Sequence, residues 1–300
     1  MKTKKQLSLK QRLNEEHTAG FIFVLPFIIG FLAFSASPII ISFCLSFTRY
    51  DILGSPTFIG VENFVRMFTD DEKFWKSFGT TFFYAIVSVP LKLIMALFVA
   101  MLFVKTTRFT SVMRAVYYLP SIMGGSIAVA VLWRRLFASD GVINAILGTD
   151  IAWLGRKDTA IWTLIILSVW QFGSSMLIFL AAIKNIPQSY HEAAIVDGAG
   201  PVKRFFSITL PMLTPIIFFN LINQVIGAFQ AFNSSYLITQ GKPLNTTLYY
   251  GVHLYNKAFD QFKMGYGCAM AWFMLLVIAF FTALIFRSSS AWVYYESEGK

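Results

Sequence analysis

The long apolar segments of this 300-residue chain contain no aspartate, glutamate or histidine. Its three histidines, His17, His191 and His253, all lie outside these segments. Proton relays and acid–base catalysis within a membrane need ionisable side chains at depth. The sequence therefore argues against a proton-coupled carrier and against an intramembrane enzyme.

The chain also lacks a nucleotide-binding loop and a cluster of metal ligands. The sequence has no GxxxxGK[ST] motif, which excludes ATP hydrolysis by that route. The two cysteines, Cys44 and Cys268, lie in apolar segments without a CxxC motif or a Cys/His cluster. We therefore expect this chain to bind no cofactor and no metal. If it moves a solute uphill, a separate subunit must supply the energy.

Charged residues are scarce and unevenly placed. They make up 13% of the chain, against 56% hydrophobic residues, and the mean hydropathy is +0.63. This composition is typical of a membrane protein. The formal net charge of +10 comes from lysines and arginines in short groups at the ends of apolar segments. That placement indicates membrane topology, because nucleic-acid-binding proteins gather such residues on one face.

Six segments are long and apolar enough to cross a bilayer, which takes about 20 residues of helix. They comprise residues 21–47, 78–104, 115–137, 160–183, 214–238 and 264–286. Backbone polar groups find no partner in lipid, so each segment is predicted to be helical. We predict an all-α, polytopic membrane protein with six transmembrane helices. The lysine-rich start also resembles a signal peptide, but the apolar segment after it is too long and lacks a clear cleavage site.

The distribution of lysine and arginine in the short loops gives a modest preference for one orientation. It places both the N-terminus and the C-terminus in the cytoplasm. The predicted organisation is a cytoplasmic tail over residues 1–20, one membrane domain over residues 21–290, and a second cytoplasmic tail over residues 291–300. No internal repeat divides the membrane domain.

A polar stretch, residues 189–206, interrupts the apolar sequence and carries helix end signals. Ser189 and Glu192 have the S-x-x-E spacing of a capping box, which predicts a helix beginning at Ser189. Gly198 is a typical C-terminal stop, and Pro201 fits the first position of a new helix. The stretch is therefore predicted to form two short helices. A helix of this kind suits the cleft of a partner protein, and it also suits a cytoplasmic turn with no partner.

A longer pattern gives this stretch a resemblance. It comprises Glu192-Ala193-Ala194, Asp197-Gly198-Ala199, Phe205, Ile208, Leu210-Pro211 and Pro215. The pattern resembles the EAA loop, here residues 184–213, of permease subunits in bacterial ATP-binding-cassette importers of carbohydrates. The stretches LSFTRYDI (45–52), FIGVENFVRMF (58–68), YYLPS (117–121) and FLAAIKNIP (179–187) are similar to the maltose/glycerol-phosphate-type first permease subunit.

The resemblance implies a type I importer permease fold, located in the bacterial cytoplasmic (inner) membrane. It implies four kinds of partner: a second homologous permease, two ATPase subunits that use ATP and Mg, an extracytoplasmic solute-binding protein, and membrane lipid. The EAA loop would dock on the ATPase. The coupling residues carried over are Glu192, Ala193, Ala194, Asp197, Gly198, Gly200, Leu210 and Pro211.

One turn departs from the pattern of this family. Such permeases often carry T-x-G-G-P after the fifth segment, and here Lys242 replaces the second glycine. Lysine tolerates a positive φ angle far less readily than glycine. The loop geometry of relatives is therefore not carried over to this turn.

Polar residues in the fourth and fifth segments are candidates for the solute pathway. At 3.6 residues per turn, those of the fifth segment fall within roughly 120° of one helix face. They are Asn220, Asn223, Gln224, Gly227, Gln230, Ala231 and Ser234, and the fourth segment adds Trp170, Gln171, Ser174 and Ser175. Amide and aromatic side chains can replace water around sugar hydroxyl groups. The same residue types also mediate helix packing in membranes.

The deepest charge is Lys92, near the middle of the second segment. Such a charge is costly, so it either faces a cavity near an anionic group or reaches the interface or a carbonyl freed by Pro90. The predicted function is a permease subunit for a sugar, with an oligosaccharide favoured. The alternatives are an acidic sugar, a phosphorylated polyol, an amino acid, a membrane enzyme or a non-transporting anchor subunit.

Overall fold

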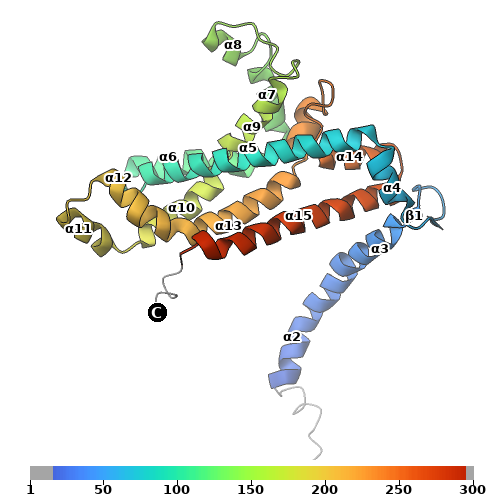
Figure 1. Ribbon diagram of the computed structural model, residues 1–300, viewed down its shortest axis with the longest axis horizontal. Coiled ribbons are helices and arrows are strands. Elements are labelled where there is room, and N and C mark those ends of the chain that lie inside the picture. The colour runs from blue at the N-terminus through green and yellow to red at the C-terminus, as the bar shows by residue number, and fades with distance from the viewer. Residues whose placement is uncertain (1–15, 295–300) are drawn as a thin grey trace, which may run out of the picture.

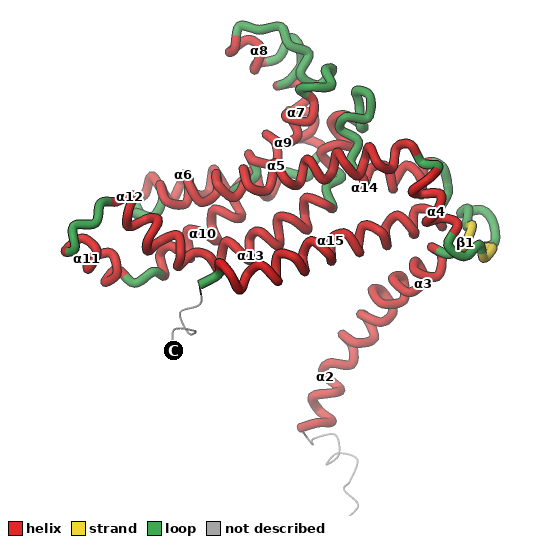
Figure 2. The backbone as a smooth tube through the Cα atoms, in the orientation of Figure 1, coloured by secondary structure: helices red, strands yellow, loops and turns green. Residues whose placement is uncertain are grey.

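The computed structural model describes residues 16–294 and consists almost entirely of helices, with one short antiparallel strand pair (Figure 2). The first half of the chain contains α2 (Glu16–Phe31), the π-helix η1 (Leu32–Ala36), α3 (Ser37–Ser46), β1 (Thr48–Arg49), β2 (Thr57–Phe58), α4 (Glu62–Thr69), α5 (Glu72–Leu102), α6 (Arg108–Met123) and α7 (Ile127–Leu136). The all-α prediction is confirmed.

The second half forms the rest of the bundle. It contains α8 (Val142–Leu147), α9 (Ala160–Trp170), α10 (Gly173–Asn185), α11 (Gln188–Val196), α12 (Pro201–Arg204), η2 (Phe205–Thr209), α13 (Leu210–Phe229), η3 (Ser235–Thr239), α14 (Tyr250–Tyr255), η4 (Asn256–Asp260) and α15 (Met264–Trp292). The predicted tails fall mostly outside the described residues, which exclude 1–15 and 295–300.

Four helices of the described chain are long and apolar enough to cross a membrane. They are Phe23–Ser46, Glu72–Leu102, Pro201–Phe229 and Met264–Trp292. Two further crossings are counted only if bent helix pairs are taken as single spans: α6 with α7, and α9 with α10. The six predicted segments are thus four long helices and two broken ones.

Three predicted segments are corrected by the structure. The third turns by 103° between α6 and α7, and the fourth bends by 40° between α9 and α10. The fifth, expected over residues 214–238 with its prolines framing the entry, instead belongs to one helix that runs from Pro201 to Phe229. Pro211 and Pro215 lie near the beginning of α13 and do not break it.

Helix α5 is the centre of the bundle and packs against α9, α10, α13 and α14. Its side chains at intervals of three and four residues are buried, which gives it one continuous inward face. Figure 1 shows α5, α13 and α15 running along the long axis of the molecule, while α2 diverges from them. In the first span, Phe23–Ser46, no residue of the most hydrophobic 18-residue stretch is buried against the rest of the protein.

The two ends of the bundle are different, and we call them the α11 end and the hairpin end. The α11 end carries α11 and α12, the link between α5 and α6, and the end of α15 (Figure 1). Two hydrogen bonds connect this end to neighbouring helices: Lys184 Nζ of α10 donates to Thr106 Oγ1 of the α5–α6 link (2.9 Å), and the amide of Tyr294, after α15, donates to Thr214 Oγ1 of α13 (2.9 Å). The opposite, hairpin end carries β1, β2, α4 and the start of α15.

Candidate functional site

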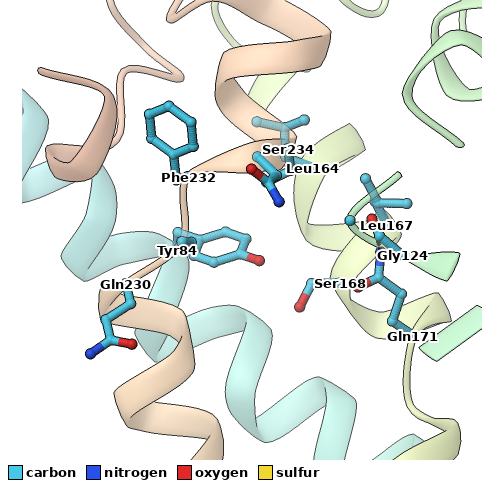
Figure 3. Close-up of a pocket in the computed structure, with 12 residues that line it drawn as sticks. Tyr84, Gly124, Leu164, Leu167, Ser168, Gln171, Gln230, Phe232 and Ser234 are labelled. Atoms are coloured by element: carbon cyan, nitrogen blue, oxygen red, sulfur yellow. Dashed lines mark hydrogen bonds between the residues drawn. The ribbon is translucent and has the colours of Figure 1, made fainter. Parts of the chain in front are cut away.

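Three helix interruptions meet around one cavity. Helix α6 ends before Gly124 and Gly125, α9 ends before Gln171, and α13 ends before Gln230. Figure 3 shows residues from these breaks, together with Tyr84 of α5, around the same space. Irregular backbone at membrane depth is tolerated where it lines a cavity, and broken helices of this kind form the binding sites of many transporters.

The cavity has a volume of about 280 Å³ and a polar lining. Its walls are formed by Tyr84, Gly124, Gly125, Leu164, Leu167, Ser168, Gln171, Gln230, Ala231, Phe232, Asn233 and Ser234. The described lining residues carry amides, hydroxyls and aromatic rings, and none is a lysine, arginine or carboxylate. Amide and hydroxyl groups both donate and accept hydrogen bonds, so this surface is suited to a neutral, hydroxyl-rich ligand.

Gln171 connects the break after α9 with the break after α6. Its Nε2 donates to the carbonyl of Gly124 at 3.2 Å, a group that the end of α6 leaves free. A Cβ atom at Gly124 would lie 2.3 Å from the Gln171 side chain, so the present packing requires glycine here. A similar close approach occurs at Gly173, where a Cβ atom would lie 2.3 Å from the carbonyl oxygen of Tyr117.

The structure divides the predicted pathway residues of α13 and its continuation. Gln230, Ala231 and Ser234 line the cavity. All three lie beyond the end of α13, so the predicted stripe is not continuous with them on one helix. Asn223 and Gly227 are exposed on α13, within two turns before Gln230.

The remaining amides of α13 make contacts within and between helices. Gln224 Nε2 donates to Ser175 Oγ of α10 (3.1 Å), which agrees with the helix-packing alternative. Asn220 is buried, and its Nδ2 donates to the carbonyl of Ile216 in its own helix (3.0 Å). Neither residue lines the cavity.

The predicted residues of the fourth segment surround its bend. Gln171 lines the cavity, while the centroid of the adjacent Trp170 ring lies 5.7 Å from that of Trp133. The backbone amide of Ser174 donates to Ser121 Oγ of α6 (3.0 Å). These contacts hold the bend against α6 and α7.

The cavity lining does not include Lys92, the deep lysine of α5. None of the ion pairs within residues 16–294 involves this side chain. The structure therefore does not place Lys92 among the residues around the cavity, where it was a candidate.

Sequence reasoning missed several lining residues, including Tyr84, Ser168 and Asn233. Tyr84 and Ser168 lie in the second and fourth segments, where the pathway prediction named only Lys92, Trp170, Gln171, Ser174 and Ser175. The pair Gly124-Gly125 was also missed, although two consecutive glycines inside an apolar segment are a breaker signal. That signal identifies the break between α6 and α7.

The turn in which Lys242 replaces the expected glycine does not require a glycine there. The positive φ angles fall on Gln240 (53°) and Gly241 (80°), and Lys242 is outside this set. Lys242 therefore does not need the positive φ angle that would favour glycine at this position.

The stretch 184–213 forms a protruding loop at the α11 end. No residue of α11 is buried, and Glu192, Ala193, Ala194 and Asp197 are all at least partly exposed. The predicted capping box is wrong: α11 begins at Gln188 with Pro187 as its N-cap, so Ser189 lies inside the helix and makes no capping bond. Pro187 enters with a ψ angle of 132°, and the helix start therefore lies upstream of Ser189.

The end of α11 follows the sequence prediction. Gly198 has a φ angle of +74°, and its amide donates to the carbonyl of Ile195 (3.0 Å). The amide of Ala199 donates to the carbonyl of Ala194 (2.8 Å), which completes a Schellman-type end. Gly200 is the N-cap of α12 and Pro201 its first residue, as predicted. Leu210 and Pro211 begin α13.

One helix joins this loop to the cavity. The helix Pro201–Phe229 contains 29 residues and spans about 43 Å at roughly 1.5 Å per residue. It begins directly after the α11 turn and ends at Gln230, which lines the cavity. The exposed loop and the cavity are therefore connected mechanically through a single helix.

Comparison with known proteins identifies the class. The family described as "Binding-protein-dependent transport system inner membrane component" matches residues 69–293. The chain belongs to this family and is a permease subunit of a binding-protein-dependent transport system. The resemblance drawn from residues 184–213 is thereby confirmed.

Individual relatives agree with this class. The chain is 53% identical over 293 residues to "Probable ABC transporter permease protein YesP" of Bacillus subtilis (strain 168), covering 95% of each chain. It is 30% identical to "Arabinooligosaccharides transport system permease protein AraP" of the same organism, covering 91% of this chain and 89% of the relative. A crystal structure of a bacterial ABC transporter involved in alginate import shares the fold, with a TM-score of 0.80, 22% identity, and coverage of 91% and 95%.

Proposed function

We propose that this chain forms half of the translocation pathway of an ATP-driven sugar importer and has no ATPase site of its own. An oligosaccharide is the favoured cargo. The observation that carries the proposal is the continuous helix Pro201–Phe229, which connects the exposed loop to the polar cavity. A push on the loop would move the far end of this helix at Phe229 and with it the next residue, Gln230, which lines the cavity.

The cargo class is inferred from the chemistry of the lining. The amide groups of Gln171, Gln230 and Asn233, with the aromatic ring of Tyr84, suit sugar hydroxyl groups. The absence of charged side chains from the described lining favours recognition of hydroxyls over carboxylates or phosphates by this subunit. The arabinooligosaccharide transport named for one relative is consistent with this class.

The partners follow from what this subunit leaves incomplete. Half of a pathway requires a second homologous permease. Coupling at Glu192, Ala193, Ala194, Asp197, Gly198, Gly200, Leu210 and Pro211 requires two ATPase subunits that use ATP and Mg. A solute-binding protein would deliver cargo at the hairpin end. The α11 end would face the cytoplasm, with both termini on that side, in the cytoplasmic membrane of a bacterium.

The coupling role can be tested in the complete complex reconstituted in liposomes with its solute-binding protein. Glu192→Ala should lower uptake at least tenfold and abolish the stimulation of ATP hydrolysis by loaded binding protein. Gln188→Ala, a change on the same exposed helix, is the matched control and should leave both unchanged. Undiminished coupling in Glu192→Ala would count against the docking role.

The cargo class can be tested separately with the cognate solute-binding protein. Arabinooligosaccharide, alginate oligosaccharide, glycerol phosphate and an amino acid mixture serve as probes in calorimetric binding. We expect the neutral oligosaccharide to bind most tightly and to stimulate ATP hydrolysis by the complex. Stimulation by the amino acid mixture or by glycerol phosphate alone would overturn the assignment to sugars.

A further inference from the structure

A buried carboxylate with several partners lies at the hairpin end, away from the cavity. Asp71 caps the start of α5, and its Oδ1 accepts a hydrogen bond from the Lys73 amide (3.2 Å). Its Oδ2 lies 2.8 Å from His253 Nε2, 2.7 Å from the Tyr266 hydroxyl and 3.3 Å from Lys257 Nζ. We call Asp71, His253, Lys257 and Tyr266 the Asp71 cluster.

Because this cluster is buried, each partner is needed to compensate the charge of Asp71. Asp71, His253 and Tyr266 are all buried. Removing one donor from a buried carboxylate leaves charge without compensation, which is strongly unfavourable. The Arg49–Glu62 pair at the same end has a similar distance, 3.0 Å, but both of its side chains are more than half exposed. An exposed ion pair of that kind contributes little to the stability of the fold.

Helix α14 and the π-helix η4 connect the Asp71 cluster to the cavity wall. This element carries His253 and Lys257, and its first amide, that of Tyr250, donates to Thr81 Oγ1 of α5 (2.7 Å). The element is therefore fixed to α5 at two places. The cluster also includes Tyr266, which fixes α15 to the same carboxylate.

Helix α14 also supports the wall. A Cβ atom at Gly251 would lie 3.3 Å from the carbonyl oxygen of Ala231, so the two backbones approach closely. The centroid of the Tyr255 ring lies 5.4 Å from that of Phe232. Both Ala231 and Phe232 line the cavity. Ala231 and Phe232 therefore pack against α14, and α14 is held in place by the Asp71 cluster.

We infer that the Asp71 cluster is a positioning device for the cavity: by fixing α14 to α5 and α15, it sets the place of wall residues 231–234. Losing one donor to Asp71 shifts α14, and the wall moves with it. The inference rests on the proposed function only for the statement that this wall contacts cargo. The geometric effect itself can be measured without any cargo.

The test uses a cysteine reporter on the wall of the full complex in membrane vesicles. The native Cys44 and Cys268 are replaced by serine and alanine, and Ser234→Cys is labelled with a membrane-impermeant maleimide. Tyr266→Phe removes one hydroxyl and keeps the ring, and His253→Leu removes a ring donor. We expect each to change the labelling rate at least threefold. Tyr266→Phe alone suffices if His253→Leu does not fold.

Matched variants distinguish a change in the position of the cavity wall from a general loss of stability of the subunit. His253→Gln retains an N–H donor and should bring the labelling rate within about twofold of the parent. Glu62→Gln breaks the exposed pair at the same end and should have no effect. A second reporter, Val142→Cys on α8, should label at one rate in every background. The inference is overturned if Ser234→Cys is unaffected by Tyr266→Phe and His253→Leu, or if Val142→Cys changes equally.

A second readout separates this inference from the proposed function. In vesicles that import arabinooligosaccharide, Tyr266→Phe should raise the half-saturating concentration of loaded binding protein or cargo more than it lowers the maximal rate. If the parent complex imports no sugar while Ser234→Cys labelling still responds, the proposed function fails and the positioning role stands. If the parent imports sugar and labelling does not respond, the positioning role fails alone.

Discussion

The hairpin end of this subunit contains a buried cluster of polar side chains, and α11 at the opposite end contains no buried residue. At the hairpin end the chain satisfies its own polar groups, with Asp71 buried among three side-chain partners. At the α11 end apolar side chains remain uncovered, with Val196 87%, Val202 69% and Phe206 61% exposed. Apolar side chains are also exposed at the hairpin end, with Leu53 at 92% and Phe58 at 80%, so both ends present surface that a partner protein can cover. The two ends differ in their buried polar groups, because no residue of α11 is buried.

This difference indicates which part of the subunit is rigid and which part moves. The helix Pro201–Phe229 begins at the α11 end and stops at the cavity, where wall residues 231 and 232 contact α14 and thereby depend on the Asp71 cluster. A force applied at the α11 end would therefore act against a fixed support at the other end.

The largest effect is expected for Gly198→Val. Its φ angle of +74° is one that a β-branched residue adopts only at a cost of about 1–2 kcal/mol or more, so the turn after α11 should reshape. Uptake by the reconstituted complex should fall more than tenfold while assembly is retained. Gly198→Asn is the matched comparison, because asparagine tolerates a positive φ angle, and it should lose much less uptake. Equal loss in both variants would show that the backbone conformation at Gly198 is not the cause.

A smaller effect is expected for Gly124→Ala at the cavity. The new Cβ atom would lie 2.3 Å from the flexible end of the Gln171 side chain, which must move away at a cost of about 1 kcal/mol, the low end for overpacking. Uptake should fall roughly three- to tenfold, because Gln171 is displaced from its contact with the Gly124 carbonyl. Adding Gln171→Ala should restore the thermal midpoint without restoring uptake. Gly125→Ala, whose nearest atom is Asn233 Nδ2 at 3.2 Å, should be the milder variant.

At the hairpin end, Asp71→Asn should affect stability in a pH-dependent way. Burial opposes ionisation of Asp71, but hydrogen bonds from His253 and Tyr266 and the charges of His253 and Lys257 hold the pKa of this carboxyl well below its usual range. Arg66 of α4 and the neighbouring Asp70 are the other charged groups that act on the cluster, through Tyr266.

A lowered pKa stabilises the folded state at pH values above the unfolded pKa of about 3.9, and the gain is lost as pH falls through the folded pKa. The free energy of unfolding of the parent should exceed that of Asp71→Asn by about 1–3 kcal/mol from pH 7 to pH 5. This difference should become smaller in stronger acid. Thermal unfolding in detergent across this pH range measures the gap. A gap that does not narrow in strong acid, where the carboxylate becomes protonated, would contradict the assignment of the charged state to Asp71.

The smallest effect is expected for Lys92→Met. Lys92 takes part in none of the ion pairs of the described residues and does not line the cavity there. Replacing its charge removes a desolvation cost without removing an ion pair, so uptake of a neutral oligosaccharide should stay within about twofold. A tenfold loss would instead favour the alternative that Lys92 faces an anionic group on the transport path.

Local sequence signals predicted some of these features well. The apolar segments identified the membrane class, Gly198 the end of α11, and Pro201 the start of α12, because each depends on a few adjacent residues. The capping box at Ser189 failed although its residue types were right, since the helix starts after Pro187 instead. The bend between α6 and α7 was signalled by Gly124-Gly125 and was overlooked among apolar residues.

Hydropathy and short-range backbone preferences are enough to show that this protein is helical, lies in a membrane and carries a polar loop between two spans. That Gln171, Gln230 and Tyr84 share one cavity, and that Asp71 meets His253 and Tyr266, becomes visible only in the folded chain. These residues come from segments far apart in the chain. Their meeting depends on how helices pack and where they break, which no local pattern specifies.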